Sequence, residues 1–144
     1  MRRCCVRRVS RWPMWINSKG LDVVYIWGYE GQYPIAEIKN ATLEQVKAAL
    51  GSYWGLITSS LTSSSPIYPT MDKLDALRTS LPDAKVTTIT YKPGIGPTSI
   101  TDPRGVINKY YYDNFGRLTK VTEKANASAQ ENIISSHSYN YANK

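Results

Sequence analysis

The chain has 144 residues and a formal net charge of +7, and this length favours one ordinary domain. Six of its 18 basic residues and none of its 11 acidic residues lie in the first 20 positions, so the rest is almost neutral. Because nucleic-acid-binding domains carry their positive charge on a folded face, this distribution excludes nucleic acid as a partner of the folded part. The basic excess instead predicts a disordered leader at residues 1–16.

The leader has no hydrophobic segment that predicts secretion or membrane insertion. Arg7, Arg8 and Arg11 interrupt its only apolar run, whereas a secretory signal needs roughly 7–15 apolar residues in succession. No stretch of the whole chain approaches the roughly 20 apolar residues of a membrane-spanning helix. Cys4 and Cys5 are adjacent, a spacing that fits neither a zinc site nor a disulfide framework. We therefore expect no signal peptide and no membrane span.

Residues 21–40 have the pattern of a β-hairpin. A β-branched and aromatic run at 23–27 is followed by Gly31, which tolerates the positive φ of a tight turn, and by an apolar return strand. Pro34 has no backbone N–H to donate to a neighbouring strand, so we expect it at the start or the edge of that return strand.

Two short helices are expected in the next part of the chain. Thr42 and Gln45 have the spacing of a capping box, in which each side chain accepts a hydrogen bond from the other residue's backbone N–H. A second helix is expected at residues 70–81, with Thr70 as its cap and a stripe of leucines on one face. The Ser/Thr-rich stretch between the helices, residues 52–69, predicts an irregular connection.

From residue 84 onward the apolar period changes to two, which indicates β-strands. A strand-and-turn unit occurs twice, because Tyr91 and Tyr112 are 21 positions apart and "TSITD" at 98–102 is matched by "TKVTE" at 119–123. A third copy is expected to begin in "HSYNYANK" at 137–144, with Tyr139 or Tyr141 in the tyrosine position. Such a period is typical of stacked arrays, in which each unit packs on its neighbour. The chain therefore divides into a basic leader, a hairpin with two helices, and a repeat segment, at residues 1–16, 17–82 and 83–144.

Three tyrosines in a row, 110–112, precede the turn of the second unit. Side chains alternate across a strand, so Tyr110 and Tyr112 share one face of the sheet. A tyrosine supplies a broad apolar ring and a hydroxyl that can bond a backbone group at its edge. We therefore interpret these tyrosines as packing residues of the array.

The sequence "DPRG", a strand, and then "YDNFGRL" closely resemble the YD repeat, also called the RHS (rearrangement hot spot) repeat, of bacterial proteins. The family pattern is an Asp-Pro-x-Gly turn, a strand, and Tyr-Asp-x-x-Gly-Arg-Leu. The residues that match it here are Asp102, Pro103, Gly105, Tyr112, Asp113, Gly116, Arg117 and Leu118. The resemblance is strong over residues 92–123, and residues 23–42 look like the segment that precedes such repeats.

The resemblance implies a β-rich α+β fold, with antiparallel β-hairpins in a YD-repeat-like sheet and two short helices. It also implies a non-enzymatic structural module, extracellular or at the cell surface, from a shell or surface protein of the toxin-encapsulating type. Because a shell needs many repeats, we expect this chain to be a fragment. Its expected partners are the remaining repeats of a larger shell or, through the open C-terminal edge of the sheet, other copies of itself.

No catalytic residue, cofactor or metal site is expected from the side-chain chemistry. His137 is the only histidine, and one histidine does not make a metal site. It is flanked by Ser135, Ser136 and Ser138, and we expect no Ser/His nucleophile pair because adjacent residues of a strand point to opposite faces. Asp113 is expected to bond local backbone N–H groups at its turn. The many aromatic residues leave one alternative open, a carbohydrate-binding or surface-adhesion module, since exposed rings stack on planar ligand faces.

Overall fold

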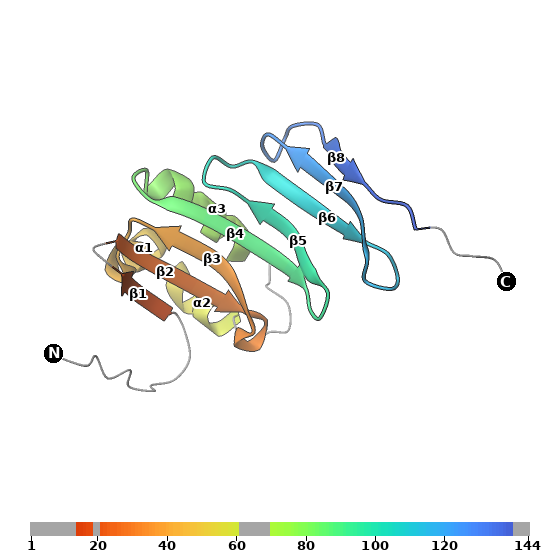
Figure 1. Cartoon of the computed structure of the whole chain (residues 1–144). Coiled ribbons are helices and arrows are strands. Elements are labelled where there is room, and N and C mark those ends of the chain that lie inside the picture. The colour runs from red at the N-terminus through yellow and green to blue at the C-terminus, as the bar shows by residue number, and fades with distance from the viewer. Residues whose placement is uncertain (1–13, 19–20, 61–69, 140–144) are drawn as a thin grey trace.

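A computed structural model of the chain describes residues 14–18, 21–60 and 70–139. These residues form one antiparallel sheet of eight strands that follow one another in chain order (Figure 1). The strands are β1 (Met14–Ser18), β2 (Leu21–Gly28), β3 (Tyr33–Lys39), β4 (Lys85–Lys92), β5 (Gly96–Thr101), β6 (Ile107–Tyr112), β7 (Leu118–Lys124) and β8 (Asn132–Ser136). The helical elements are η1, a 3-10 turn (Tyr29–Gly31), α1 (Leu43–Leu50), α2 (Tyr53–Ser60) and α3 (Thr70–Ser80). The predicted β-rich α+β class is confirmed.

The predicted N-terminal hairpin is confirmed as β2 and β3, and α1 forms for the predicted reason. Thr42 Oγ1 accepts a hydrogen bond from the Gln45 N–H at 3.2 Å, and Gln45 Oε1 accepts one from the Thr42 N–H at 2.8 Å. These two bonds satisfy backbone donors that the first helical turn leaves free. The second predicted helix is α3, which begins at Thr70, next to residues outside the described ranges.

The prediction of an irregular connection at residues 52–69 was wrong for its first part, which forms a third helix, α2. Ile57 is buried in the core and Trp54 packs against that core, three residues away on the same helix face. Burial of this apolar face outweighs the modest helix propensity of the serines and threonines beside it. Residues 61–69 lie outside the described residues.

The boundary predicted for the leader was also wrong at its C-terminal end. Residues 14–18 form β1, which pairs antiparallel with β2 from Met14 opposite Tyr25 to Ser18 opposite Leu21. The backbone edge of β2 supplies hydrogen-bonding partners that no local sequence pattern reveals. Residues 1–13 of the predicted leader lie outside the described residues.

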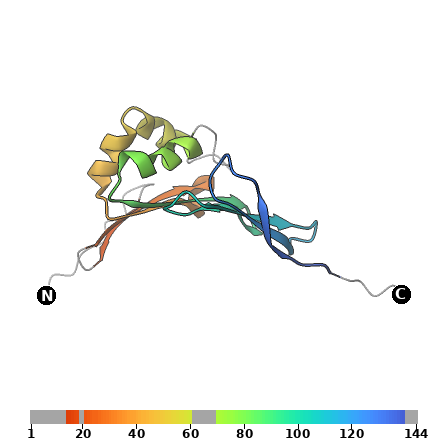
Figure 2. The same ribbon diagram turned by 90° about the horizontal axis from the view of Figure 1, so that it is seen from above.

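The helices cover one face of the sheet at the end that holds β2, β3 and β4 (Figure 2). Cross-strand pairs such as Val24–Ile38 and Ile38–Val86 lie under the helices, and all three residues are completely buried. From α3 the matching residues are Leu74 and Leu77, which belong to the predicted leucine stripe. The rest of the sheet, from β5 to β8, extends beyond the helical layer (Figure 2).

Candidate functional site

Three successive hairpins of the sheet share one layout. In each, the strand pairing shifts by one residue close to the turn, which is a β-bulge on the return strand. On the turn side of each bulge an aromatic residue pairs with an apolar one, and these pairs are Trp27–Pro34, Tyr91–Pro97 and Tyr112–Leu118. The repeat seen in the sequence at Tyr91 and Tyr112 is therefore present in the structure. The hairpin of β2 and β3 has the same layout, which the sequence interpretation missed although an aromatic residue and a proline flank its turn.

The turn between β5 and β6 is organised by one carboxylate. Asp102 Oδ1 accepts hydrogen bonds from the backbone N–H groups of Arg104 at 2.8 Å and Val106 at 2.9 Å, and Oδ2 pairs with the Arg104 side chain at 2.9 Å. Burial by itself raises the pKa of Asp102, but these bonds outweigh it and hold the pKa below its usual value. Gly105 closes the turn with a φ of 86°, a conformation that glycine adopts readily.

The turn between β6 and β7, at the other end of β6, is built in the same way. Asp113 Oδ1 accepts from the backbone N–H groups of Phe115 at 2.8 Å and Arg117 at 3.0 Å, and Oδ2 pairs with the Arg117 guanidinium at 2.8 Å. The bond from the Arg117 N–H is the main reason why the pKa of Asp113 lies below its usual value. Gly116, with a φ of 78°, donates its N–H to the Asp113 carbonyl. The predicted backbone role of Asp113 is thus what the geometry shows.

Tyrosine hydroxyls bond the backbone of the neighbouring hairpin. The Tyr29 hydroxyl accepts from the Tyr91 N–H at 2.7 Å and donates to the Tyr91 carbonyl at 2.9 Å. The Tyr112 hydroxyl donates to the Pro97 carbonyl, and the Tyr139 hydroxyl donates to the Leu118 carbonyl. Each ring therefore spans the step from one strand pair to the next, which is the packing role predicted for the tyrosines.

A close-packed contact joins the turns of the two repeat hairpins. A methyl group added at Gly96 would lie 2.8 Å from the Tyr112 hydroxyl, and one added at Gly116 would lie 3.5 Å from the Ile95 side chain. Neighbouring hairpins thus fit together through a glycine on one side and a larger side chain on the other.

The family comparison matches the part of the sheet that holds both Asp-centred turns. The family model for the RHS Repeat matches residues 96–128. This chain carries an RHS repeat. The matched range contains all eight residues that the sequence analysis assigned to the repeat motif, from Asp102 to Leu118. Searches of the curated proteins and of the solved structures gave no match.

Arg78 of α3 fastens the helical layer to the RHS repeat. Its guanidinium donates to the carbonyls of Thr101 and Asp102, both at 2.9 Å, and to the Thr88 hydroxyl at 3.1 Å. It also pairs with Asp75 one helical turn away. Only 13% of the Arg78 side chain is exposed, so these bonds form away from bulk water. No sequence pattern points to this residue, because its partners other than Asp75 lie on β4, at the end of β5 and in the turn that follows β5.

Glu131, just before β8, fastens the last strand to the RHS repeat. Its carboxylate accepts hydrogen bonds from the hydroxyls of Thr122 and Tyr111 and pairs with the Lys109 ammonium at 3.4 Å. Chiefly because of the Thr122 and Tyr111 bonds, the pKa of Glu131 is lowered to about 2. Tyr111 therefore has its own role, in addition to the packing role of its neighbour Tyr112.

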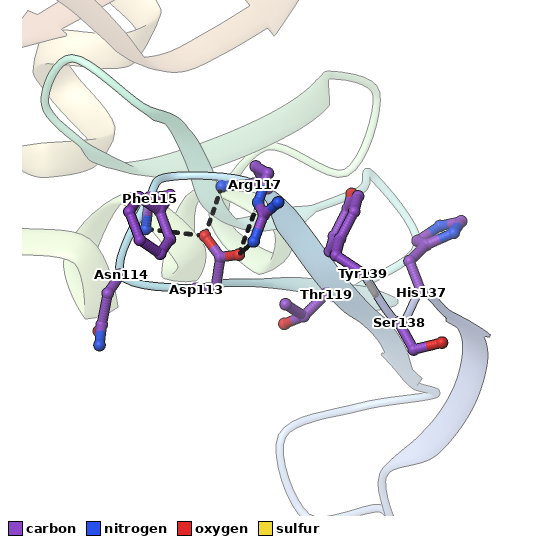
Figure 3. Close-up of a pocket in the computed structure, with 8 residues that line it drawn as sticks. All are labelled: Asp113, Asn114, Phe115, Arg117, Thr119, His137, Ser138 and Tyr139. Atoms are coloured by element: carbon purple, nitrogen blue, oxygen red, sulfur yellow. Dashed lines mark hydrogen bonds and ion pairs between the residues drawn. The ribbon is translucent and has the colours of Figure 1, made fainter. Parts of the chain in front are cut away.

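A surface hollow of about 350 Å³ lies where the β6–β7 turn meets the segment after β8 (Figure 3). The Arg117 guanidinium lies over two aromatic rings, 5.3 Å from the centre of Phe115 and 4.3 Å from that of Tyr139. His137 also lines the hollow, and its Nε2 lies 3.0 Å from Ser135 Oγ. The prediction that no serine lies within reach of His137 was wrong for Ser135, because residues two apart on an extended segment face the same way.

The described residues contain no cluster of three or more His, Cys, Asp or Glu side chains that could hold a metal ion. None of the helices in the described ranges is long and apolar enough to cross a membrane.

Proposed function

We propose that this chain is a non-enzymatic structural module whose role is to carry RHS hairpins as part of a larger bacterial shell or surface protein. The observation that supports it best is the pair of turns at the two ends of β6 that share one backbone hydrogen-bond pattern, each organised by an aspartate and closed by a glycine with positive φ. Turns of one geometry at alternate ends allow strands to be added one after another.

The chemistry of the polar residues also supports a structural role. The carboxylates of Asp102, Asp113 and Glu131 each accept two or more hydrogen bonds. Carboxylates held by such hydrogen bonds have a structural role. A general acid or base must instead exchange a proton near neutral pH. The finer proposal, by resemblance to the RHS family, is a shell that encloses a toxin and lies outside the cell or at its surface.

The proposal is tested by lengthening the array by one unit. A second copy of residues 102–122 is inserted directly after Thr122, so that it reproduces both Asp-centred turns and the hydroxyls that hold Glu131. Because units of an array stabilise one another through their interfaces, we expect a cooperative unfolding transition at a higher temperature and a larger β-sheet signal in circular dichroism.

The matched control carries the same insertion with alanine in place of both aspartates of the inserted copy. It should gain little or no stability, since its turns lose the carboxylate that satisfies their backbone donors. The proposal fails if the faithful copy unfolds separately from the rest of the chain, or if both insertions behave alike.

The surface hollow supports a second candidate, a carbohydrate-binding or surface-adhesion module. The Phe115 ring is 77% exposed, and polar groups of Asn114, His137 and Ser138 line the hollow beside it. A glycan array would test this function, with Phe115→Ala expected to abolish any binding. Tyr53→Ala is the control, because Tyr53 is an exposed aromatic residue on α2, away from the hollow.

A further inference from the structure

Among the described residues, β8 has a neighbouring strand on one side only, because the strand order gives it the single neighbour β7. Its sequence, Asn132–Ser136, contains no charged residue and no proline, and these are the features that usually prevent edge strands from pairing with other chains. Ile133 and Ile134 are 66% and 57% exposed. The edge therefore combines free backbone groups with apolar side chains.

The register of β8 on β7 distinguishes one residue of this edge. Asn132, Ile133, Ser135 and Ser136 all have partners on β7, whereas Ile134 falls at the shift in register and has none. Ile134 is also the central residue of the five-residue strand. A pairing centred on this position would give it the cross-strand neighbour that β7 does not provide.

An antiparallel pair of β8 strands centred on Ile134 is self-complementary. It places Ile134 opposite Ile134, Ile133 opposite Ser135, and Asn132 opposite Ser136, so no like charges meet. One position further out, Glu131 lies opposite His137 of the other copy, which brings a carboxylate towards an imidazole. Like charges directly opposite each other would oppose association, and this register brings none together.

We propose that two copies of this chain associate through β8, antiparallel and about a two-fold axis at Ile134, to give one sheet that continues across both copies. The inference concerns this chain studied alone and goes beyond the proposed function, because a second copy would occupy the edge that the next repeat occupies in a longer array. The same surface patch meets itself, so the assembly closes as a dimer. Pairing of β8 with β1 of the next copy would instead give open chains.

The first experiment measures the mass of the whole chain by light scattering over a concentration series. We expect a monomer–dimer equilibrium. Ile134→Lys would place two ammonium groups opposite each other at the axis and should raise the dissociation constant at least about tenfold. Phe115→Lys, a change at another exposed apolar residue on the β6–β7 turn, is the matched control and should leave the dimer unchanged.

The second experiment tests the register by cross-linking, in a background with serine at Cys4 and Cys5. Directly opposite residues have Cα atoms about 4.5–5.5 Å apart, which suits a disulfide, so Ile134→Cys should form a covalent dimer under mild oxidation. In Ile133→Cys the two thiols would be diagonal neighbours about 7–8 Å apart and should cross-link much more slowly. Because a bulge can itself blunt an edge, this comparison decides whether the edge at Ile134 pairs.

A dimer that Ile134→Lys dissociates and Ile134→Cys traps supports the proposal. A monomer at every concentration, a dimer indifferent to Ile134→Lys, equal cross-linking at both cysteine positions, or species that keep growing with concentration would overturn it. The lengthened array described above reports on the structural function independently, since its stability is read from unfolding and does not require association.

Discussion

Gly116 offers the sharpest test of the repeat geometry. Its φ of 78° lies in the left-handed region, where an L-residue costs roughly 1–2 kcal/mol, and a β-branched residue more. The added Cβ would meet Ile95 at 3.5 Å, an ordinary contact, so the cost comes from the backbone and not from a clash. We expect Gly116→Val to destabilise the fold by at least about 1 kcal/mol.

The substitution series at Gly116 separates backbone strain from packing. For a chain of this size, 1 kcal/mol corresponds to a fall of roughly 3–6 °C in the melting temperature, which differential scanning calorimetry resolves. Gly116→Asn should cost clearly less than Gly116→Val, because asparagine tolerates positive φ better than other non-glycine residues. An unchanged melting temperature for the valine variant, or equal losses for asparagine and valine, would refute the reasoning.

Three further predictions concern the anchors of the sheet. Arg78→Gln should destabilise the chain by about 2–3 kcal/mol, because it removes charge-assisted hydrogen bonds to two carbonyls in a mostly buried position. The control is Lys85→Gln at an exposed residue, which should change the melting temperature little. Comparable losses of stability in the two variants would contradict the role of Arg78. The folded state holds the pKa of Glu131 below its usual value, at about 2. The contribution of Glu131 to folding stability is therefore complete above about pH 4.5 and is lost as the pH falls towards 2. Glu131→Gln should make the stability less dependent on pH in that window, and an unaltered acid transition would contradict this role of Glu131. Removal of residues 1–13 should leave the melting temperature unchanged, whereas removal of residues 1–18 should lower it because β1 pairs with β2; an equal effect of the two truncations would show that β1 adds nothing.

The sequence alone determined the features whose physical causes are local. The capping box of Thr42 and Gln45 spans four residues, and each Asp-centred turn is complete within five, so the side chain and the backbone groups it satisfies are neighbours in the chain. The RHS motif was recognisable for the same reason, since Asp113, Gly116 and Arg117 interact within one turn. The β2–β3 hairpin also follows from a short turn between two β-prone runs.

Only the tertiary structure decided the features whose partners lie far away in the chain. Residues 14–18 form a strand because they pair with the edge of β2. Residues 53–60 form a helix because Ile57 is buried in the core. Apart from the pair of Arg78 with Asp75, the partners of Arg78 and Glu131 lie nine or more residues away along the chain. Stretches rich in serine or arginine favour irregular backbone structure locally. Burial of apolar side chains and long-range hydrogen bonds contribute enough free energy to override that preference.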